Sequence, residues 1–245
     1  IKYKIYKTVI IKFMRKKVVI VGSAGNFGKY IFNELKKTNN VLGIERKKSK
    51  NNFECKDLSN SKMNFETFKL IKRKNPNLDA VIICTGKSKK DLSKNIDQKF
   101  INSFKSNFLT VSNTIESYQK VYKNKPTKII VISSIAAIKV IDAPIEYSTS
   151  KSALNHYCQI KAKELSKFKI KLNVISPGNI LNKNNNWYLK KKVNSKKVEN
   201  YIKKNVPLNS FCKPNQILAL CKLLISDDGN FFQGSNIVMD GGQIL

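Results

Sequence analysis

The chain has 245 residues, which is long enough to bury one substantial hydrophobic core, and its 41% hydrophobic and 26% charged residues exclude a disordered protein. Its 47 Lys and Arg against 16 Asp and Glu give a formal net charge of +31, a balance that by itself favours nucleic-acid or anionic-membrane partners. Because the lysines are spread along the whole length, we expect a solvated basic surface with no specific nucleic-acid site and no membrane partner.

Residues 1–13 alternate apolar residues with lysines and lack the unbroken apolar core of a signal peptide or membrane span. Met14, followed by basic residues and an apolar run, resembles a natural start. We therefore expect residues 1–13 to be an upstream extension without function and residues 14–245 to form a single domain. The five cysteines and the one histidine, His156, show no metal-ligand spacing. This pattern predicts no metal site, and reduced thiols favour a cytoplasmic protein.

Short β-branched runs alternate with helical stretches from residue 17 onward, which is typical of a parallel sheet covered by helices. The near-continuous apolar character of the runs suits strands buried on both faces. In chain order, the expected elements are strand 18–21, helix 27–37, strand 41–45, helix 63–74, strand 80–84, helix 100–122, strand 129–133, helix 147–167, strand 171–175, helix 215–226 and strand 236–239. The sequence therefore predicts an α/β fold, a doubly wound parallel sheet in three αβα layers.

The segment 182–206 lacks regular apolar periodicity, is rich in Asn and Lys, and contains the only tryptophan, Trp187. It follows a predicted strand, and in open α/β sheets ligand-covering elements lie in such positions. We expect a loop-and-helix excursion that covers the substrate. The alternative is a surface insertion without a role in binding.

A glycine-rich turn follows the first predicted strand and leads into a helix. Glycines let the backbone turn sharply and approach a pyrophosphate, and the helix N-terminus offers N–H groups and a positive dipole end to its charge. In this context the turn predicts a dinucleotide site formed by Gly22, Ser23, Gly25, Asn26, Phe27 and Gly28.

An acidic residue, Glu45, ends the second predicted strand, where a ribose 2′-hydroxyl requires an acceptor. This position favours NAD, because a carboxylate repels a 2′-phosphate. Arg46 keeps NADP open, since a guanidinium one residue later can pair with that phosphate. Asp57, followed by Leu58, comes after a run that can form a third strand and is a candidate acceptor for the adenine amino group; otherwise it is a turn aspartate.

Tyr147 and Lys151 lie four residues apart at the start of a predicted helix, and therefore on one face. A tyrosine is a poor base at neutral pH, but a nearby ammonium and an oxidised nicotinamide both favour the phenolate. Ser134 follows the strand 129–133, where its hydroxyl can bind a substrate oxygen. Together with the glycine turn, these residues predict hydride transfer with Tyr147 as the acid/base.

On these motifs, residues 16–245 resemble the short-chain dehydrogenase/reductase family, which has a Rossmann fold. The resemblance implies that Tyr147 is the acid/base, that Ser134 polarises the substrate oxygen, and that Lys151 lowers the tyrosine pKa and holds the nicotinamide ribose. It adds Asn107, which would position a water linking Lys151 to solvent. It also implies cofactor contacts from residues in two loops, Gly86 and the group Pro177, Gly178 and Ile180.

The chain departs from the family pattern at three places. Asn26 occupies the second glycine position, only Gly86 is kept in the loop after the fourth strand, and Asn182 replaces a threonine. The resemblance implies a small carbonyl or alcohol substrate, either a 3-oxoacyl thioester or a sugar-like compound, and a homo-oligomer (dimer or tetramer). The alternative is a catalytically silent dinucleotide-binding sensor or nucleic-acid-associated protein, motivated by the charge and the altered motifs.

Overall fold

A parallel β-sheet forms the centre of the computed structural model, which describes residues 15–47, 52–88, 91–123, 125–183 and 185–245. Its strand order is β3-β2-β1-β4-β5-β6-β7, and all neighbouring strands are parallel. The strands are β1 (Lys17–Val21), β2 (Asn40–Glu45), β3 (Asn52–Glu54), β4 (Ala80–Ile83), β5 (Thr127–Ile132), β6 (Ile170–Pro177) and β7 (Asn236–Met239). The predicted doubly wound sheet is confirmed, including the third strand.

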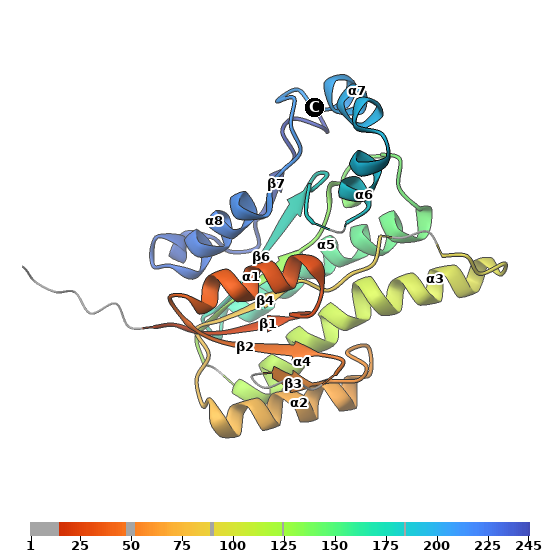
Figure 1. Ribbon diagram of the computed structural model, residues 1–245. Helices are drawn as coiled ribbons and strands as arrows, with labels where there is room; N and C mark the ends of the chain where they lie inside the picture. Colours follow the sequence, from red (N-terminus) through yellow and green to blue (C-terminus); the bar gives the residue numbers. More distant parts are fainter. Residues whose placement is uncertain (1–14, 48–51, 89–90, 124, 184) are drawn as a thin grey trace, which may run out of the picture.

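Helices cover both faces of the sheet and complete the three layers (Figure 1). One face carries α1 (Asn26–Lys36) and α8 (Pro214–Ile225), whose buried residues pack on Val18 and Ile20. The other face carries α2 (Ser61–Lys74), α4 (Thr110–Tyr122) and α5 (Ile145–Ser166), which pack on Val19 and Val21. Successive residues of β1 thus serve opposite cores, which explains why the strand is apolar throughout.

The sheet order reverses beside β1, which pairs with β2 on one side and with β4 on the other. Crossover helices from adjacent strands then leave toward opposite faces, so a crevice opens beyond the carboxyl ends of these strands. Parallel pairing brings the residues that follow β1, β2 and β4 to the same edge. The fold therefore places the glycine turn, Glu45 and the loop of Gly86 around one crevice.

The helix expected over 100–122 begins earlier and contains an irregular turn. It starts as α3 (Ile96–Phe104), where Oδ1 of Asn95 accepts from the backbone N–H of Asp97 at 2.7 Å and caps the first turn. A π-helical turn, Lys105–Leu109, joins α3 to α4. Such turns are often found at functional sites, and Asn107 lies at the centre of this one.

The segment 182–206 contains two helices, α6 (Asn186–Val193) and α7 (Ser195–Asn205). They close over a separate small core formed by Val198, Val206 and Phe211 with several partly buried neighbours. Trp187 lies in this core, with ring centroids 4.7 Å from Phe211. The excursion is therefore a packed helical unit at the carboxyl edge of the sheet, with few buried apolar residues of its own.

Candidate active site

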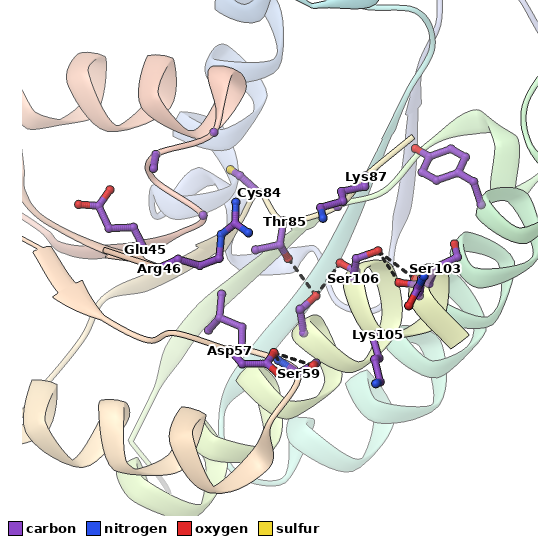
Figure 2. Close-up of a pocket in the computed structure, with 18 of the residues that line it drawn as sticks. Glu45, Arg46, Asp57, Ser59, Cys84, Thr85, Lys87, Ser103, Lys105 and Ser106 are labelled. Carbon is purple, nitrogen blue, oxygen red and sulfur yellow. Dashed lines mark hydrogen bonds between the residues drawn. The ribbon is translucent and has the colours of Figure 1, made fainter. Parts of the chain in front are cut away.

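A cleft of about 910 Å³ opens at the carboxyl edge of the sheet (Figure 2). It runs from the end of β2, past the glycine turn and the loop after β4, to the start of α5. Its lining includes eight of the predicted residues: Gly22, Gly25, Glu45, Arg46, Asp57, Leu58, Gly86 and Tyr147. None of the described residues from 182–206 lines it, so the predicted covering segment lies beside this cleft and does not form its wall.

The glycine turn forms the floor of the cleft. Gly22 has a φ of +84°, a conformation that favours glycine, and Gly25 is the N-cap of α1 without a side-chain cap. A Cβ on Gly28 would lie 2.2 Å from the carbonyl oxygen of Gly22, so only glycine lets α1 start this close to the turn. Gly22 and Gly25 border the cleft directly, whereas Gly28 acts through packing.

The other predicted members of the turn lie outside the lining of the cleft. Ser23 is buried, and its Oγ lies 3.5 Å from Oε2 of Glu45. Asn26 and Phe27 occupy the first turn of α1, and Phe27 packs against the core under α1 and α8. Cofactor contacts from Ser23, Asn26 and Phe27 stay predictions.

Glu45 and Arg46 are adjacent in the chain but point in different directions. Nδ2 of Asn52, on the neighbouring strand β3, donates to Oε1 of Glu45 at 2.7 Å. Figure 2 shows the Arg46 side chain extending into the cleft, whereas the Glu45 carboxylate points away from its centre. The guanidinium is therefore the more accessible of the two charges for a ligand.

Asp57 is held by a tight turn at the same end of the cleft. Its Oδ1 accepts from the backbone N–H of Ser59 at 2.8 Å and from the Ser59 hydroxyl at 2.6 Å. These hydrogen bonds hold the pKa of Asp57 below its ordinary value. Leu58 is buried in the core and also lines the cleft. Asp57 thus serves the turn as well as facing the site.

The catalytic candidates come together in two pairs near the other end of the cleft, Tyr147 with Ser134 and Lys151 with Asn107. Lys151 is only 2% exposed, and its Nζ donates to the carbonyl oxygen of Ile132, the last residue of β5, at 3.1 Å. Burial lowers the pKa of Lys151 to about 8. Burial raises the pKa of Tyr147, while the neighbouring Ser134 side chain acts in the opposite direction. The structure thus places the Ser134 side chain next to Tyr147.

Gly86 explains how the lysine reaches the site. A Cβ at this position would lie 2.9 Å from Oδ1 of Asn107 and 3.3 Å from Nζ of Lys151, and its φ is +148°. A side chain would therefore enter the space between these two polar groups. Gly86, the one residue of this loop that matches the family pattern, therefore leaves room for Asn107 and Lys151 to lie close together.

Asn107 is fully buried, and protein groups engage both ends of its amide. Oδ1 accepts from the backbone N–H of Lys87 at 2.9 Å, and Nδ2 donates to the carbonyl oxygens of Lys87 and Ser103 at 3.2 and 3.1 Å. The amide therefore fixes the loop after β4 against the π-helical turn. The water that the resemblance assigns to Asn107 stays a prediction.

The predicted contacts after β6 lie at the base of the excursion. A Cβ on Gly178 would lie 2.9 Å from Cα of Asp240, and Ile180 forms a parallel bridge with Cys212. Asn179, between them, accepts at Oδ1 from Nε1 of Trp187 at 2.8 Å. Pro177, Gly178 and Ile180 do not line the cleft in this structure. They connect the sheet edge to α6.

Several residues of the cleft were not predicted from the sequence. They come mainly from the loop after β4, from α3 and from the start of α5: Lys87, Asp91, Lys99, Asn102, Ser103, Ser106 and Glu146. Two local signals were available, because Lys87 follows Gly86 and Glu146 precedes Tyr147. The α3 residues gave no signal, since polar residues on a helix are ordinarily read as its solvated face.

The sequence model of a family described as enoyl-(acyl carrier protein) reductase matches residues 30–243. The chain belongs to the short-chain dehydrogenase/reductase family. This match begins within α1, after β1 and the glycine turn, and ends in the C-terminal turn, so it includes Asn107, Ser134, Tyr147 and Lys151. It agrees with the family that the motifs indicated.

Individual relatives agree with this assignment. The chain is similar to an NAD-dependent glycerol dehydrogenase of Listeria innocua, 32% identical over 48% of this chain and 44% of the relative, so less than half of that protein is matched. It is 26% identical to a 3-oxoacyl-acyl-carrier-protein reductase of Buchnera aphidicola over 96% of this chain and 99% of the relative. An L-sorbose reductase from Gluconobacter frateurii, complexed with NADPH and L-sorbose, shares the fold with a TM-score of 0.81 at 18% identity, covering 94% of this chain and 97% of that one.

Two further features bear on partners. Among the described residues, no cluster of three or more His, Cys, Asp or Glu side chains is arranged to hold a metal ion. Within the same ranges, every helix is too short or too polar to cross a bilayer.

Proposed function

We propose that the protein is an NAD(P)-dependent oxidoreductase that interconverts a carbonyl compound and an alcohol, with Tyr147 as the proton donor and acceptor. The proposal rests on one observation above the others. A tyrosine that interacts with Ser134 lies at the inner end of a cleft whose floor is a glycine turn. The remaining features of the cleft support the same activity.

The chain's own residues fit a nicotinamide dinucleotide. The glycine turn leaves backbone beside the cleft where side chains would clash, and Gly86 keeps the space open around Lys151. Arg46 and Asp57 lie at the outer end, where an adenosine moiety would bind. The bound cofactor would supply or accept the hydride, which no side chain of the protein can do.

Proton transfer belongs to the residues at the inner end. In the reductive direction the Tyr147 hydroxyl gives its proton to the carbonyl oxygen, and Ser134 donates a hydrogen bond to the same oxygen. A tyrosine of ordinary pKa is protonated at neutral pH, and burial raises the pKa of Tyr147 further, so the phenol can act as the proton donor in reduction. Lys151 contributes a buried positive charge that stabilises the phenolate as it forms.

We further propose NADP(H) as the preferred cofactor. The sequence favours NAD through Glu45, yet the Glu45 carboxylate is engaged by Asn52 and directed away from the centre of the cleft, while Arg46 extends into it. A guanidinium pairs well with the 2′-phosphate. The geometry supports the alternative that Arg46 left open.

The assembly and the compartment are proposals as well. Ile160 on α5 and Leu109 beside α4 are large apolar residues exposed to solvent, which supports a homo-oligomer joined through these helices. All five cysteines are free, which supports a reducing compartment such as the cytoplasm.

Replacement of the tyrosine tests the central proposal. Tyr147→Phe should lower turnover of a carbonyl panel by roughly 100-fold or more, while dinucleotide affinity stays at the wild-type value. Tyr157→Phe is the matched control, because it removes a hydroxyl from the same helix at a position where the hydroxyl donates to Glu116 at 3.1 Å. Retained turnover in Tyr147→Phe, or no turnover by the wild type with either dinucleotide, would refute the proposal.

A further inference from the structure

The inner end of the cleft has a polar wall. Beyond Gly86 the lining consists of polar and charged residues from the loop after β4, from the helix that begins with α3, and from α5: Lys87, Asp91, Lys99, Asn102, Ser103, Ser106, Glu146 and Tyr147. The apolar lining residues, Ala24, Ile44, Leu58 and Cys84, belong to the outer and middle parts. A substrate that reaches Tyr147 along this wall therefore meets hydrogen-bonding groups.

Glu146 is the unusual member of this wall. It lies in the first turn of α5, directly before Tyr147, and is only 7% exposed. Its Oε1 accepts one long hydrogen bond, from the backbone N–H of Asp91 at 3.5 Å. Among the described residues no Lys or Arg forms a salt bridge with it. A buried carboxylate with so few donors is costly unless a ligand supplies them.

Helix capping accounts for only part of this placement. An acidic residue in the first turn interacts favourably with the helix dipole, by roughly 0.3–1 kcal/mol at an exposed position. That interaction does not require burial. The Glu146 side chain instead turns toward Asp91 and the cleft, where its oxygens are available to a molecule bound beside Tyr147.

The turn that carries Glu146 and Tyr147 is held firmly. The Ser103 hydroxyl donates to the carbonyl oxygen of Glu146 at 2.9 Å and lies 3.0 Å from the Ser150 hydroxyl. Ser150 in turn donates to the carbonyl oxygen of Tyr147 at 2.8 Å. These bonds fix the start of α5 against α3, so a group bound to Glu146 has a defined position relative to the Tyr147 hydroxyl.

Lys87 adds a donor to the same part of the cleft. Its backbone N–H and carbonyl oxygen are both bonded to Asn107, and Figure 2 shows its side chain extending into the cleft beyond Thr85. A carboxylate and an ammonium at one end of a cleft suit a ligand with several hydroxyl groups, because each hydroxyl both donates and accepts.

We propose that Glu146 accepts a hydrogen bond from a hydroxyl group near the reacting carbon, and that the substrate is a small polyhydroxylated compound of the sugar or polyol class. This inference rests on the proposed oxidoreductase function and chooses one of the two substrate classes that the sequence left open. Glu146 is then a specificity-determining residue. It takes no part in proton transfer.

Paired substrates of equal carbon number test the proposal, with reduction rates measured for glyceraldehyde against propanal, dihydroxyacetone against acetone, and a C5–C6 sugar panel. An acetoacetyl thioester represents the other class. The wild type should prefer the hydroxylated member of each pair by roughly tenfold or more in kcat/KM. Glu146→Leu, which removes both acceptor oxygens at similar volume, should remove most of this preference through KM. Glu66→Leu, the same change at an exposed position of α2, should keep it.

Four results would overturn the inference. If Glu146→Leu discriminates as the wild type does, the residue does not set specificity. If the wild type reduces the acetoacetyl thioester and ignores hydroxylated compounds, the substrate class is wrong while the oxidoreductase function stands. If no substrate of either class is reduced, the proposed function fails together with the inference. Should Glu146→Leu not fold, the wild-type ratio decides alone, and a ratio near one refutes the proposal.

Discussion

The amide of Asn107 bonds to both backbone groups of Lys87, accepting from its N–H at 2.9 Å and donating to its carbonyl oxygen at 3.2 Å. One buried side chain thus ties the loop after β4 to the π-helical turn. The loop contains Gly86, beside which Lys151 lies. Asn107 therefore orders the inner end of the cleft by direct contact with the protein backbone.

Replacing this amide should lower both stability and activity. Asn107→Ala removes the side-chain partner of the backbone N–H and carbonyl oxygen of Lys87, and should cost roughly 1–3 kcal/mol in the free energy of unfolding measured by urea denaturation. Asn113→Ala is the control on α4, since its Nδ2 donates once, to Ser59 at a half-buried position. If the Asn107→Ala protein is as stable as the control, Asn107 does not stabilise the loop after β4 against the π-helical turn.

Removal of the Arg46 charge should change cofactor preference. Arg46→Gln loses the charge-assisted contact to a 2′-phosphate, so NADPH should bind at least about tenfold more weakly while NADH affinity stays within about twofold. Separate fluorescence titrations measure the two constants. Arg73→Gln, on α2, removes the same charge away from the cleft. If the wild type binds NADH more tightly than NADPH, Glu45 and not Arg46 determines the cofactor preference.

The buried ammonium of Lys151 should make folding stability depend on pH. Its pKa in the folded protein, about 8, lies below the ordinary value of 10.5. Between these values the unfolded chain holds a proton that the folded chain has released, so the free energy of unfolding rises with pH across this window. The gain is on the order of 3 kcal/mol.

Lys151→Met should lose this gain, as measured by urea unfolding at pH 7.5 and pH 10. The pKa of Lys128 is also lowered by burial, but both proteins contain this residue, so its effect cancels in the comparison. Lys163→Met, at an exposed position of the same helix, should keep the wild-type slope. Equal slopes for Lys151→Met and the wild type would show that the ammonium is not buried in solution.

The small core of the excursion should unfold locally. Phe211→Ala removes a ring that packs on Trp187 and Tyr201, in a cluster separate from the two cores of the sheet. Hydrogen exchange should therefore quicken in α6 and α7 while the sheet stays protected. Phe68→Ala, in the main core, should instead cost about 3–5 kcal/mol overall. Uniform loss of protection in Phe211→Ala would contradict a separate unit.

The sequence by itself determined the features that depend on local or repeating patterns. Apolar runs such as 18–21 predict strands buried on both faces, and the bounds of the strands agree with the structure to within two residues. The glycine turn and the spacing of Tyr147 and Lys151 were also readable, because a turn and one helical period are local geometry. Pattern recognition of this kind needs no knowledge of distant neighbours.

Tertiary structure alone decided which way side chains point and what surrounds them. Glu45 and Arg46 are adjacent in the sequence, yet their side chains point in different directions. Asn52, on another strand, donates a hydrogen bond to the Glu45 carboxylate, whereas Arg46 extends into the cleft. Glu146 is an ordinary first-turn acid until α3 and the loop of Asp91 bury it. Burial and hydrogen-bond partners arise from segments far apart in the chain. Spacing in one sequence carries no information about such contacts, because they depend on how the helices pack on the sheet.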